Sequence, residues 1–226
     1  KNTMITHIGI IMDGNRRWAV KNGMQKIKGH EYVANRIKEL IDLALEEKIK
    51  FLTLYAWSTE NWKRSRLEQK ILFAIGARFL IKGKDYFAKN GVKVVHLGRE
   101  DRLPAQFMRE IKKTETQTRG HSRLQLNLCL DYGGRDEIIR AIKKIPQNKL
   151  KGIDEGDFAK YLDTSKIPDP DLIIRTSGEC RLSNFLLWQC AYTELFFTDT
   201  LFPDFTKKEL KKILSEFRRR ERRGGK

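Results

Sequence analysis

The sequence predicts an α/β protein in one domain over residues 1–226, with a mainly parallel, six-stranded sheet flanked by helices. Short apolar runs alternate along the chain with segments in which apolar residues recur every three or four positions, a pattern typical of parallel sheets with connecting helices. No internal repeat, low-complexity segment or long linker divides the chain. Because 40% of the 226 residues are hydrophobic, we expect one large core and exclude global disorder.

Six short apolar runs are the expected strands, because each is too short for a typical helix and is bounded by polar or turn-forming residues. They cover residues 8–12, 51–57, 92–95, 124–130, 171–175 and 195–197. The second run is also rich in aromatic and other β-prone residues, which favours a strand.

Five segments between or after these runs have helical periodicity. They are residues 30–48, residues 67–87, a segment that Pro104 starts, a segment that follows Gly133-Gly134, and a closing segment with Leu210, Ile213, Leu214 and Phe217. Residues 71–81 are apolar on nearly every side of the second helix. That helix is therefore expected to be buried or to line an apolar cavity.

The chain is strongly basic. Lys and Arg number 46 and Asp and Glu number 29, which gives a net charge of +17. This excess predicts an anionic partner, which is a nucleic acid, a membrane surface or a phosphorylated small molecule. Residues 207–226 alone hold ten basic and three acidic residues, which suits either a solvated helix face or a functional basic end.

The sequence has no pattern of membrane insertion or export. No apolar run approaches the roughly 18 residues of a membrane-spanning helix, and residues 1–4 lead straight into a strand-like run without signal-peptide architecture. The three cysteines, Cys129, Cys180 and Cys190, are too few and too scattered for a disulfide framework or a zinc site. We therefore expect a cytoplasmic protein with reduced thiols.

Polar and basic residues follow three of the predicted strands. These segments are residues 13–18, 58–64 and 175–183, and Glu194 lies just before the sixth strand. Because ligands of open parallel sheets bind outside the carboxyl ends of the strands, we expect the three loops to converge on one rim, together with the carboxylates of Asp13 and Glu194.

The segment after the first strand has the composition of a phosphate site. Gly14 lets the backbone approach an anion closely, and the helix start that follows offers free N–H groups and a positive dipole end. Arg17 can add a bidentate contact. Asp13 beside a phosphate is a natural Mg²⁺ ligand, because Mg²⁺ takes few carboxylates together with phosphate oxygens. The alternative is an ordinary tight turn at Asp13-Gly14-Asn15.

Arg175, Arg181 and Ser183 form a second candidate anion site, because two guanidinium groups and a hydroxyl suit a diphosphate. The alternative is surface arginines on a loop. His30 follows Gly29 at a helix start and is either structural or a donor beside a phosphate near neutral pH. The indoles of Trp57 and Trp62 are expected to pack rather than to stack on a ligand.

Seven stretches of the chain together resemble the cis-prenyltransferases of the undecaprenyl diphosphate synthase family. They are residues 7–19, 29–30, 54–62, 127–135, 171–175, 183–189 and 203–205, in the order in which the family has them. The resemblance covers nearly the whole chain.

The resemblance implies a homodimer whose parallel sheet is flanked by helices and whose subunits contain an apolar tunnel. It also implies Mg²⁺-dependent condensation of isopentenyl diphosphate with an allylic diphosphate such as farnesyl diphosphate, with cis geometry at each new double bond. The product would be a long-chain polyprenyl diphosphate such as undecaprenyl diphosphate, a precursor of the lipid carrier for cell-wall glycan synthesis. No nucleic acid is expected as a partner, whereas peripheral contact with a membrane would serve product release.

The resemblance also assigns residues to roles. Asp13 would be catalytic and would hold Mg²⁺ together with Glu194, while His30 and Asn61 would assist beside the reacting centre. Isopentenyl diphosphate would be bound by Arg175, Arg181 and Ser183. The residues implied at the allylic diphosphate are Gly14, Asn15, Arg16, Arg17, Trp18, Lys26, His30, Ser58, Glu60, Asn61, Trp62 and Arg64.

Two departures from the family pattern bear on these roles. Lys26 stands where the family usually has Arg, which keeps the charge but loses the bidentate fork. The chain end reads RERRGGK over residues 220–226 and lacks the Phe that commonly precedes Gly-Gly. An Arg-x-Gly element near the end can reach the partner's isopentenyl diphosphate site in relatives, and this role is less secure for Arg222, Arg223 and Gly224.

Two other classes of protein are alternatives to this family. A nucleic-acid-binding module would account for the charge, but the chain lacks basic residues interleaved with stacking aromatics and lacks a known reading motif. A non-catalytic partner subunit on the same fold would have lost the turn at Asp13-Gly14-Asn15 and its arginine. This chain keeps both, which favours an active enzyme.

Overall fold

The computed structural model describes residues 4–220 and contains one six-stranded sheet in the order β3-β4-β2-β1-β5-β6. All five neighbouring pairs of strands are parallel, which confirms the predicted fold class. The strands are β1 (His7–Ile11), β2 (Phe51–Ser58), β3 (Val92–Leu97), β4 (Leu124–Tyr132), β5 (Leu172–Arg175) and β6 (Glu194–Phe197).

The longer predicted helices are present, and short helical turns lie beside the strand ends. The α-helices are α1 (Asn15–Lys21), α2 (Val33–Glu46), α3 (Arg66–Asn90), α4 (Ala105–Thr118), α5 (Gly134–Lys144), α6 (Glu155–Ala159) and α7 (Lys207–Arg219). The 3₁₀ turns are η1 (Lys26–Glu31), η2 (Thr59–Lys63), η3 (Gln147–Lys149) and η4 (Phe202–Asp204). The predicted helix over residues 30–48 is shorter than expected, because η1 takes its first residues and α2 begins at Val33.

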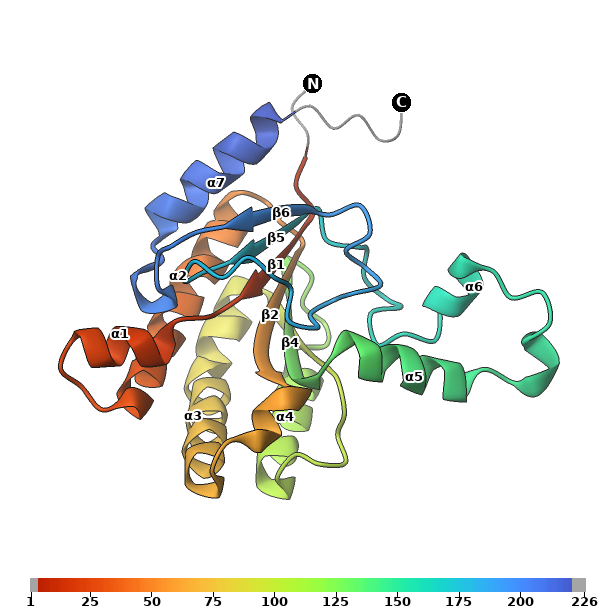
Figure 1. Cartoon of the computed structure of the whole chain (residues 1–226), viewed down its shortest axis with the longest axis horizontal. Helices are drawn as coiled ribbons and strands as arrows, with labels where there is room; N and C mark the ends of the chain where they lie inside the picture. The colour runs from red at the N-terminus through yellow and green to blue at the C-terminus, as the bar shows by residue number, and fades with distance from the viewer. Residues whose placement is uncertain (1–3, 221–226) are drawn as a thin grey trace.

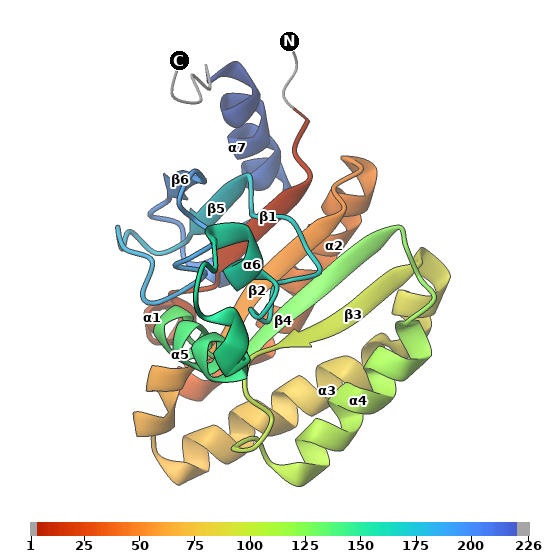
Figure 2. The same cartoon turned by 90° about the vertical axis from the view of Figure 1, so that its right-hand side faces the viewer.

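The sheet separates two apolar layers. Ile8 and Ile10 of β1 point into a core shared with α2, α3, α4 and α7, whereas Ile11 points to the other face, toward Phe185 and Leu186. Figure 1 shows the order of the elements, and Figure 2 looks onto the sheet with α5 and α6 in front of it and α2 behind it. Among residues 4–220, no helix is both long enough and apolar enough to cross a bilayer.

A buried polar trio joins the three central strands. The His7 Nε2 atom lies 2.7 Å from Thr53 Oγ1, and Asn127 Nδ2 donates to that hydroxyl at 2.9 Å. The other ring nitrogen of His7 lies 2.7 Å from the carbonyl oxygen of Pro168. Burial lowers the pKa of His7 to about 4, against smaller opposing effects of the Pro168 carbonyl and the Asp171 charge. The imidazole is therefore neutral in the folded protein at neutral pH.

This lowered pKa predicts a loss of stability in mild acid. As the pH falls through 6.5 toward 4, the unfolded chain takes up a proton at His7 that the folded protein does not, so the free energy of unfolding decreases. We expect His7 alone to contribute a loss of about 2 kcal/mol between pH 7 and pH 5. Urea unfolding of the wild type and of His7→Gln at both pH values measures it, and an equal pH dependence in the two proteins would contradict the assignment.

Candidate active site

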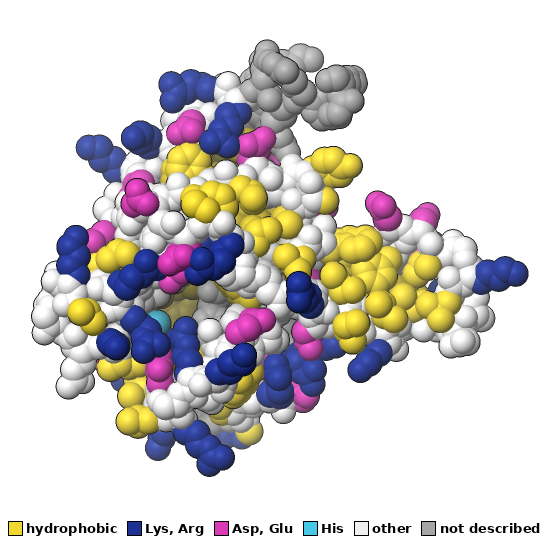
Figure 3. Space-filling view, viewed as in Figure 1, with side chains coloured by type: hydrophobic (Ala, Val, Ile, Leu, Met, Phe, Trp, Pro, Cys, Tyr) yellow, Lys and Arg dark blue, Asp and Glu magenta, His cyan; other side chains and the backbone are white. Residues whose placement is uncertain are grey.

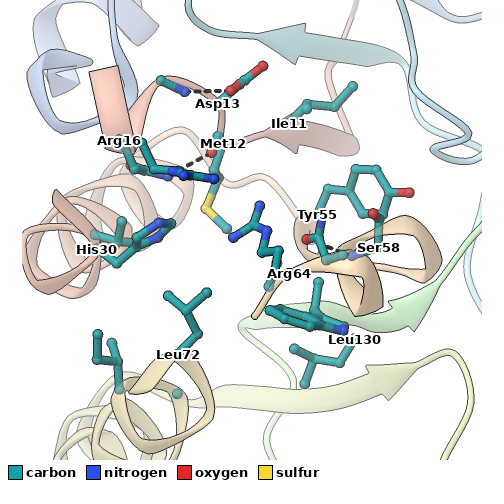
Figure 4. Close-up of a pocket in the computed structure, with 18 of the residues that line it drawn as sticks. Ile11, Met12, Asp13, Arg16, His30, Tyr55, Ser58, Arg64, Leu72 and Leu130 are labelled. Atoms are coloured by element: carbon teal, nitrogen blue, oxygen red, sulfur yellow. Dashed lines mark hydrogen bonds between the residues drawn. The ribbon is translucent and has the colours of Figure 1, made fainter. Parts of the chain in front are cut away.

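A cavity of about 1190 Å³ opens where the carboxyl ends of β1, β2 and β5 meet. Its mouth is polar and carries Asp13, Arg17, Lys26 and Arg64, while its depth is lined by apolar side chains of α2, α3, α4 and β4. Figure 4 shows Arg16 of α1, His30 of η1 and Arg64, which follows η2, around this space. The loops after β1, β2 and β5 thus meet at one rim, as the sequence predicted.

Asp13 and Arg175 form an ion pair at the centre of this rim. The Arg175 Nη2 atom donates to Asp13 Oδ2 at 2.9 Å, and the Gly14 N–H donates to Asp13 Oδ1 at 2.7 Å. Arg175 is only 4% exposed, and its Nε atom is buried without a hydrogen-bond partner among the described residues. The pair joins the end of β1 to the end of β5.

The turn after β1 has the geometry of an anion site. Gly14 precedes the first residue of α1 with φ of 100°, a left-handed conformation that favours glycine. Arg17, one turn into α1, donates to the carbonyl oxygen and hydroxyl of Ser177 at 3.1 and 2.6 Å. A methyl group on Gly29 would lie 1.9 Å from the Asn15 carbonyl oxygen. Glycine at position 29 therefore allows η1 to lie directly against α1.

The loop after β5 is held by the same arginine. The Arg175 Nη1 atom donates to Ser183 Oγ at 2.7 Å and to the Arg181 carbonyl oxygen at 2.5 Å. Both Arg175 and Ser183 line the cavity. The Arg181 side chain is 60% exposed, pairs with Glu179 and does not contribute to the cavity wall.

Residues of η2 close the rim after β2. Ser58 and Asn61 form a reciprocal capping box, in which the backbone N–H of Ser58 donates to Asn61 Oδ1 at 3.3 Å. Glu60 accepts a hydrogen bond from Asn184 Nδ2 at 3.0 Å. Burial raises the pKa of Glu60, but hydrogen bonds from Asn184 and from nearby groups outweigh it, so the net pKa is lowered.

His30 faces the cavity as a neutral imidazole. Burial, with smaller contributions from the positive charges of Arg64 and Arg16, lowers its pKa to about 4. Its Nε2 atom is buried without a hydrogen-bond partner among the described residues. The guanidinium group of Arg64 lies 5.5 Å from the centre of the Trp57 ring, and burial lowers the pKa of Arg64 as well. The rim therefore concentrates positive charge around one neutral histidine.

Glu194, Trp18 and Trp62, like Arg181, were placed at the site by the resemblance but do not line the cavity. Glu194 begins β6 in register with Leu172 and Ile8, whereas Asp13 lies beyond the opposite ends of those strands. This offset is at least about 10 Å along the strand direction, so Glu194 of the same chain does not approach Asp13. The Glu194 carboxylate instead accepts from Arg220 Nη1 at 2.9 Å.

The indoles of Trp18 and Trp62 also point away from the cavity. Trp18 donates to Asp204 Oδ1 at 2.7 Å, and Trp62 donates to Asp131 Oδ1 at 2.7 Å. Neither residue lines the cavity. Trp57 does line it, and its ring packs against those of Trp62 and Phe73, as expected for packing residues.

One side of α3 forms a wall of the cavity. Its contribution comes from Leu72, Phe73, Ile75, Gly76, Phe79 and Leu80. The expectation that residues 71–81 are enclosed all round is wrong for Ala74, which is exposed, and for Ile81, which is 58% exposed. The small residue Ala56 of β2 lies in the cavity wall, but Ala74 and Ala77 do not.

Several residues that complete the rim were not singled out from the sequence. Tyr55 and Asn184 line the cavity, and the hydroxyl of Thr176 accepts from the Asp13 N–H at 3.0 Å. Asn184 directly follows Ser183 in one of the stretches that carry the family resemblance, which is the signal that could have identified it.

Comparison with known proteins matches this chain to a family. A family model described as putative undecaprenyl diphosphate synthase matches residues 11–225. An isoprenyl transferase of Aquifex aeolicus is 46% identical over 219 residues, covering 97% of this chain and 95% of its own. An isoprenyl transferase of Streptococcus mutans is 46% identical over 229 residues, covering 97% and 92%.

Two solved structures have the same fold. A crystal structure of lavandulyl diphosphate synthase from Lavandula x intermedia in complex with dimethylallyl diphosphate is 35% identical, with a TM-score of 0.95 over 99% of both chains. A probable undecaprenyl diphosphate synthase from Campylobacter jejuni is 39% identical, with a TM-score of 0.84 over 99% of this chain and 100% of that one. The chain therefore belongs to the undecaprenyl diphosphate synthase family and is a prenyltransferase of the isoprenyl transferase type.

Proposed function

We propose that this prenyltransferase condenses isopentenyl diphosphate with an allylic diphosphate such as farnesyl diphosphate, making each new double bond cis. The observation that carries the proposal is a rim with two groups of anion-binding residues at the mouth of one deep apolar cavity. The product would be a long-chain polyprenyl diphosphate such as undecaprenyl diphosphate, which serves as the precursor of a lipid carrier for cell-wall glycans.

The allylic diphosphate would lie on the turn after β1. Gly14 and Asn15, at the start of α1 and its positive dipole end, line the cavity there. Arg16 of α1, Lys26 of η1 and Arg64 after η2 add positive charge, which would stabilise the diphosphate as it departs. The neutral His30 and the side chain of Asn61 line the same space, where they would donate hydrogen bonds to the leaving group.

The residues present fit Mg²⁺ only together with a diphosphate. Among residues 4–220 no cluster of three or more His, Cys, Asp or Glu forms a ready metal cage. The half-buried Asp13 carboxylate at the rim suits Mg²⁺ nevertheless, because Mg²⁺ is commonly held by one or two carboxylates plus phosphate oxygens. A bound Mg²⁺ would supply Lewis-acid neutralisation of the leaving diphosphate.

Isopentenyl diphosphate would lie on the loop after β5. Arg175 and Ser183 line that part of the cavity, and the exposed Arg181 adjoins them in the chain. Holding both substrates in the cavity makes the attack of the isopentenyl double bond on the allylic carbon effectively intramolecular. The bond from that carbon to the diphosphate breaks, and loss of a proton from the isopentenyl unit gives the new double bond. The apolar lining excludes water, which would otherwise capture an allylic centre with cationic character.

The growing hydrocarbon chain would extend from the rim into the apolar depth. Ala56 of β2 and Gly76 of α3 are small wall residues there, while Phe107 of α4 and Leu80 add bulk. A cavity of about 1190 Å³ exceeds the range of roughly 300–1,000 Å³ usual for small-ligand pockets. This volume supports a long apolar product.

A homodimer and membrane contact belong to the same proposal. Ile139 and Ile142 of α5 are 53% and 46% exposed, and Leu150 is 41% exposed. Figure 3 shows an apolar patch in the region of α5 and α6, whereas Lys and Arg side chains, with some Asp and Glu, surround the hollow near the centre. A second copy on the apolar patch would cover it.

Release of a lipid product from the basic mouth suits peripheral contact with an anionic membrane. The Arg222, Arg223 and Gly224 element lies outside the described residues.

Replacement of Asp13 is expected to abolish turnover. Asp13→Ala should reduce activity about a thousandfold or more, because metal-assisted departure of the leaving group supplies several kcal/mol of barrier reduction. Asp13→Asn serves as a milder variant that keeps an oxygen near Arg175. Turnover is measured with labelled isopentenyl diphosphate, farnesyl diphosphate and Mg²⁺, with EDTA as a second control. A folded Asp13→Ala protein with more than about a tenth of wild-type activity would show that the metal assignment is wrong.

Replacement of the arginines should distinguish the two diphosphate sites. Arg181→Ala should raise the KM for isopentenyl diphosphate about tenfold or more, because a hydrogen bond to a charged group contributes about 1.5–3 kcal/mol. The KM for the allylic substrate should change little. Arg175→Ala should affect both substrates, since the Arg175 guanidinium also holds Asp13. Steady-state kinetics with each substrate varied measures this, and equal damage to both by Arg181→Ala would contradict separate sites.

Bulk in the cavity wall should shorten the product. Ala56→Leu places a larger side chain where the hydrocarbon would pass, and overpacking an apolar space costs about 1–3 kcal/mol. The first condensation should survive, because the rim is unchanged. Ala74→Leu is the matched control, since Ala74 is exposed and does not line the cavity. Chromatographic sizing beside a melting curve measures the effect. Unchanged product length in folded Ala56→Leu would refute this path for the chain.

A further inference from the structure

Asn184 connects three parts of the rim through its side chain and backbone. Its Nδ2 atom donates to Glu60 Oε1 in η2 at 3.0 Å. Its Oδ1 atom accepts from the N–H of Arg135 at 2.9 Å, and its backbone carbonyl accepts from the N–H of Gly134 at 2.7 Å. The two acceptors satisfy the first two N–H groups of α5, whose own N-cap residue, Gly133, has no side chain.

Close packing and strained backbone torsions indicate that Asn184 is held in one defined position at this junction. Asn184 has φ of 68° and Ser183 has φ of 47°, and both are uncommon conformations for residues other than glycine. A methyl group on Gly133 would lie 2.6 Å from Asn184 Nδ2 and 2.6 Å from Thr59 Oγ1. The absence of a side chain at position 133 thus lets Asn184 reach η2. The hydrogen bonds of Asn184 hold the loop in its strained form.

Glu60 places a negative charge at a rim that is proposed to bind diphosphates. Its carboxylate lines the cavity, where it would repel an anion. Hydrogen bonds from Asn184, Ser58 and Thr59 outweigh the effect of burial and lower the pKa of Glu60, so the charge is retained. A carboxylate with this set of donors is suited to holding a neighbouring amide in place.

We infer that Glu60 and Asn184 form a clasp that sets the spacing of the two substrates, with Asn184 as a positioning residue for the condensation. The inference rests on the proposed function. Glu60 lies next to Asn61 on the allylic side, and Asn184 lies next to Ser183 on the isopentenyl side. The hydrogen bond between them fixes the distance between loops that follow β2 and β5. Misplacement of reacting groups by about 1 Å can cost on the order of a hundredfold in rate, so this distance bears directly on turnover.

An exchange of the two side chains tests the clasp. Asn184→Asp keeps an oxygen for the Arg135 N–H and tolerates the left-handed backbone, but it sets two carboxylates against each other. The double variant Glu60→Gln with Asn184→Asp restores one amide donor and one carboxylate acceptor in reversed order. Asn184→Asp should lower kcat about tenfold, and the double variant should recover kcat to within about threefold of the wild type.

Two further measurements separate positioning from folding and from binding. The melting temperature of Asn184→Asp should stay within about 3 °C of the wild type, because the cap on α5 is kept. The affinity of Asn184→Asp for a non-reactive thio analogue of the allylic diphosphate, measured by calorimetry, should fall less than its kcat, because the added carboxylate repels the anion but neither substrate position loses a ligand. Glu60→Ala is the second variant. It removes the clasp from the η2 side without touching α5, and it should also lower kcat about tenfold.

The outcomes distinguish the clasp from the proposed function. A double variant no more active than Asn184→Asp alone, or Glu60→Ala with wild-type kcat, overturns the clasp. A loss of analogue affinity equal to the loss of kcat also overturns it, because Glu60 or Asn184 would then act in binding. A wild-type protein that binds both diphosphates but does not condense them refutes the proposed function instead.

Discussion

The ion pair of Asp13 and Arg175 is the contact on which the arrangement of the rim depends. It joins the ends of two adjacent strands, and the same guanidinium group holds the Ser183 hydroxyl of the following loop. Because Arg175 is almost fully buried, its charge requires the Asp13 carboxylate and the loop oxygens as partners. The two proposed diphosphate positions therefore share one arginine, and a change at either position reaches the other through it.

Strained backbone is concentrated in the loop that this arginine holds. Ser177, Ser183, Asn184 and Leu186 all have positive φ, although none of them is glycine. Residues in such conformations persist only when surrounding contacts determine them, and they are common at functional sites. Here hydrogen bonds from Arg175, Gly134 and Tyr55 provide those contacts. The loop is thus organised before a ligand arrives, which reduces the entropy that binding must overcome.

The two faces of the sheet have different roles around this rim. On one face, α2 and α3 leave the apolar cavity between themselves and the sheet, and α4 contributes Phe107 to its wall. On the other face, Phe185 and Leu186 pack directly on the strands and anchor the segment that carries Ser183 and Asn184. The basic side chains Arg16, Lys26 and Arg64 gather at the cavity mouth, and burial with two nearby arginines keeps His30 neutral among them. Positive charge and apolar volume thus meet at one place, as a diphosphate with a hydrocarbon tail requires.

Local patterns in the sequence determined the parallel α/β class, the six strands and the placement of polar, basic turns after the strands. These features depend on the alternation of strand-like and helical segments, on the periodicity of apolar residues and on turn residues, all within short stretches of the chain. For that reason the sequence could place Asp13, Gly14 and Arg175 at the rim where the strands end.

Only the tertiary structure decided where side chains point and which distant loops touch. Strand register places Glu194 at the amino ends of the strands, whereas Asp13 lies beyond their carboxyl ends. The rotation of α3 turns Ala74 outward, while Ile75 lines the cavity. The hydrogen bond between Glu60 and Asn184 joins residues 124 positions apart. Such contacts follow from the packing of whole elements against the sheet, and no pattern within either local segment encodes them.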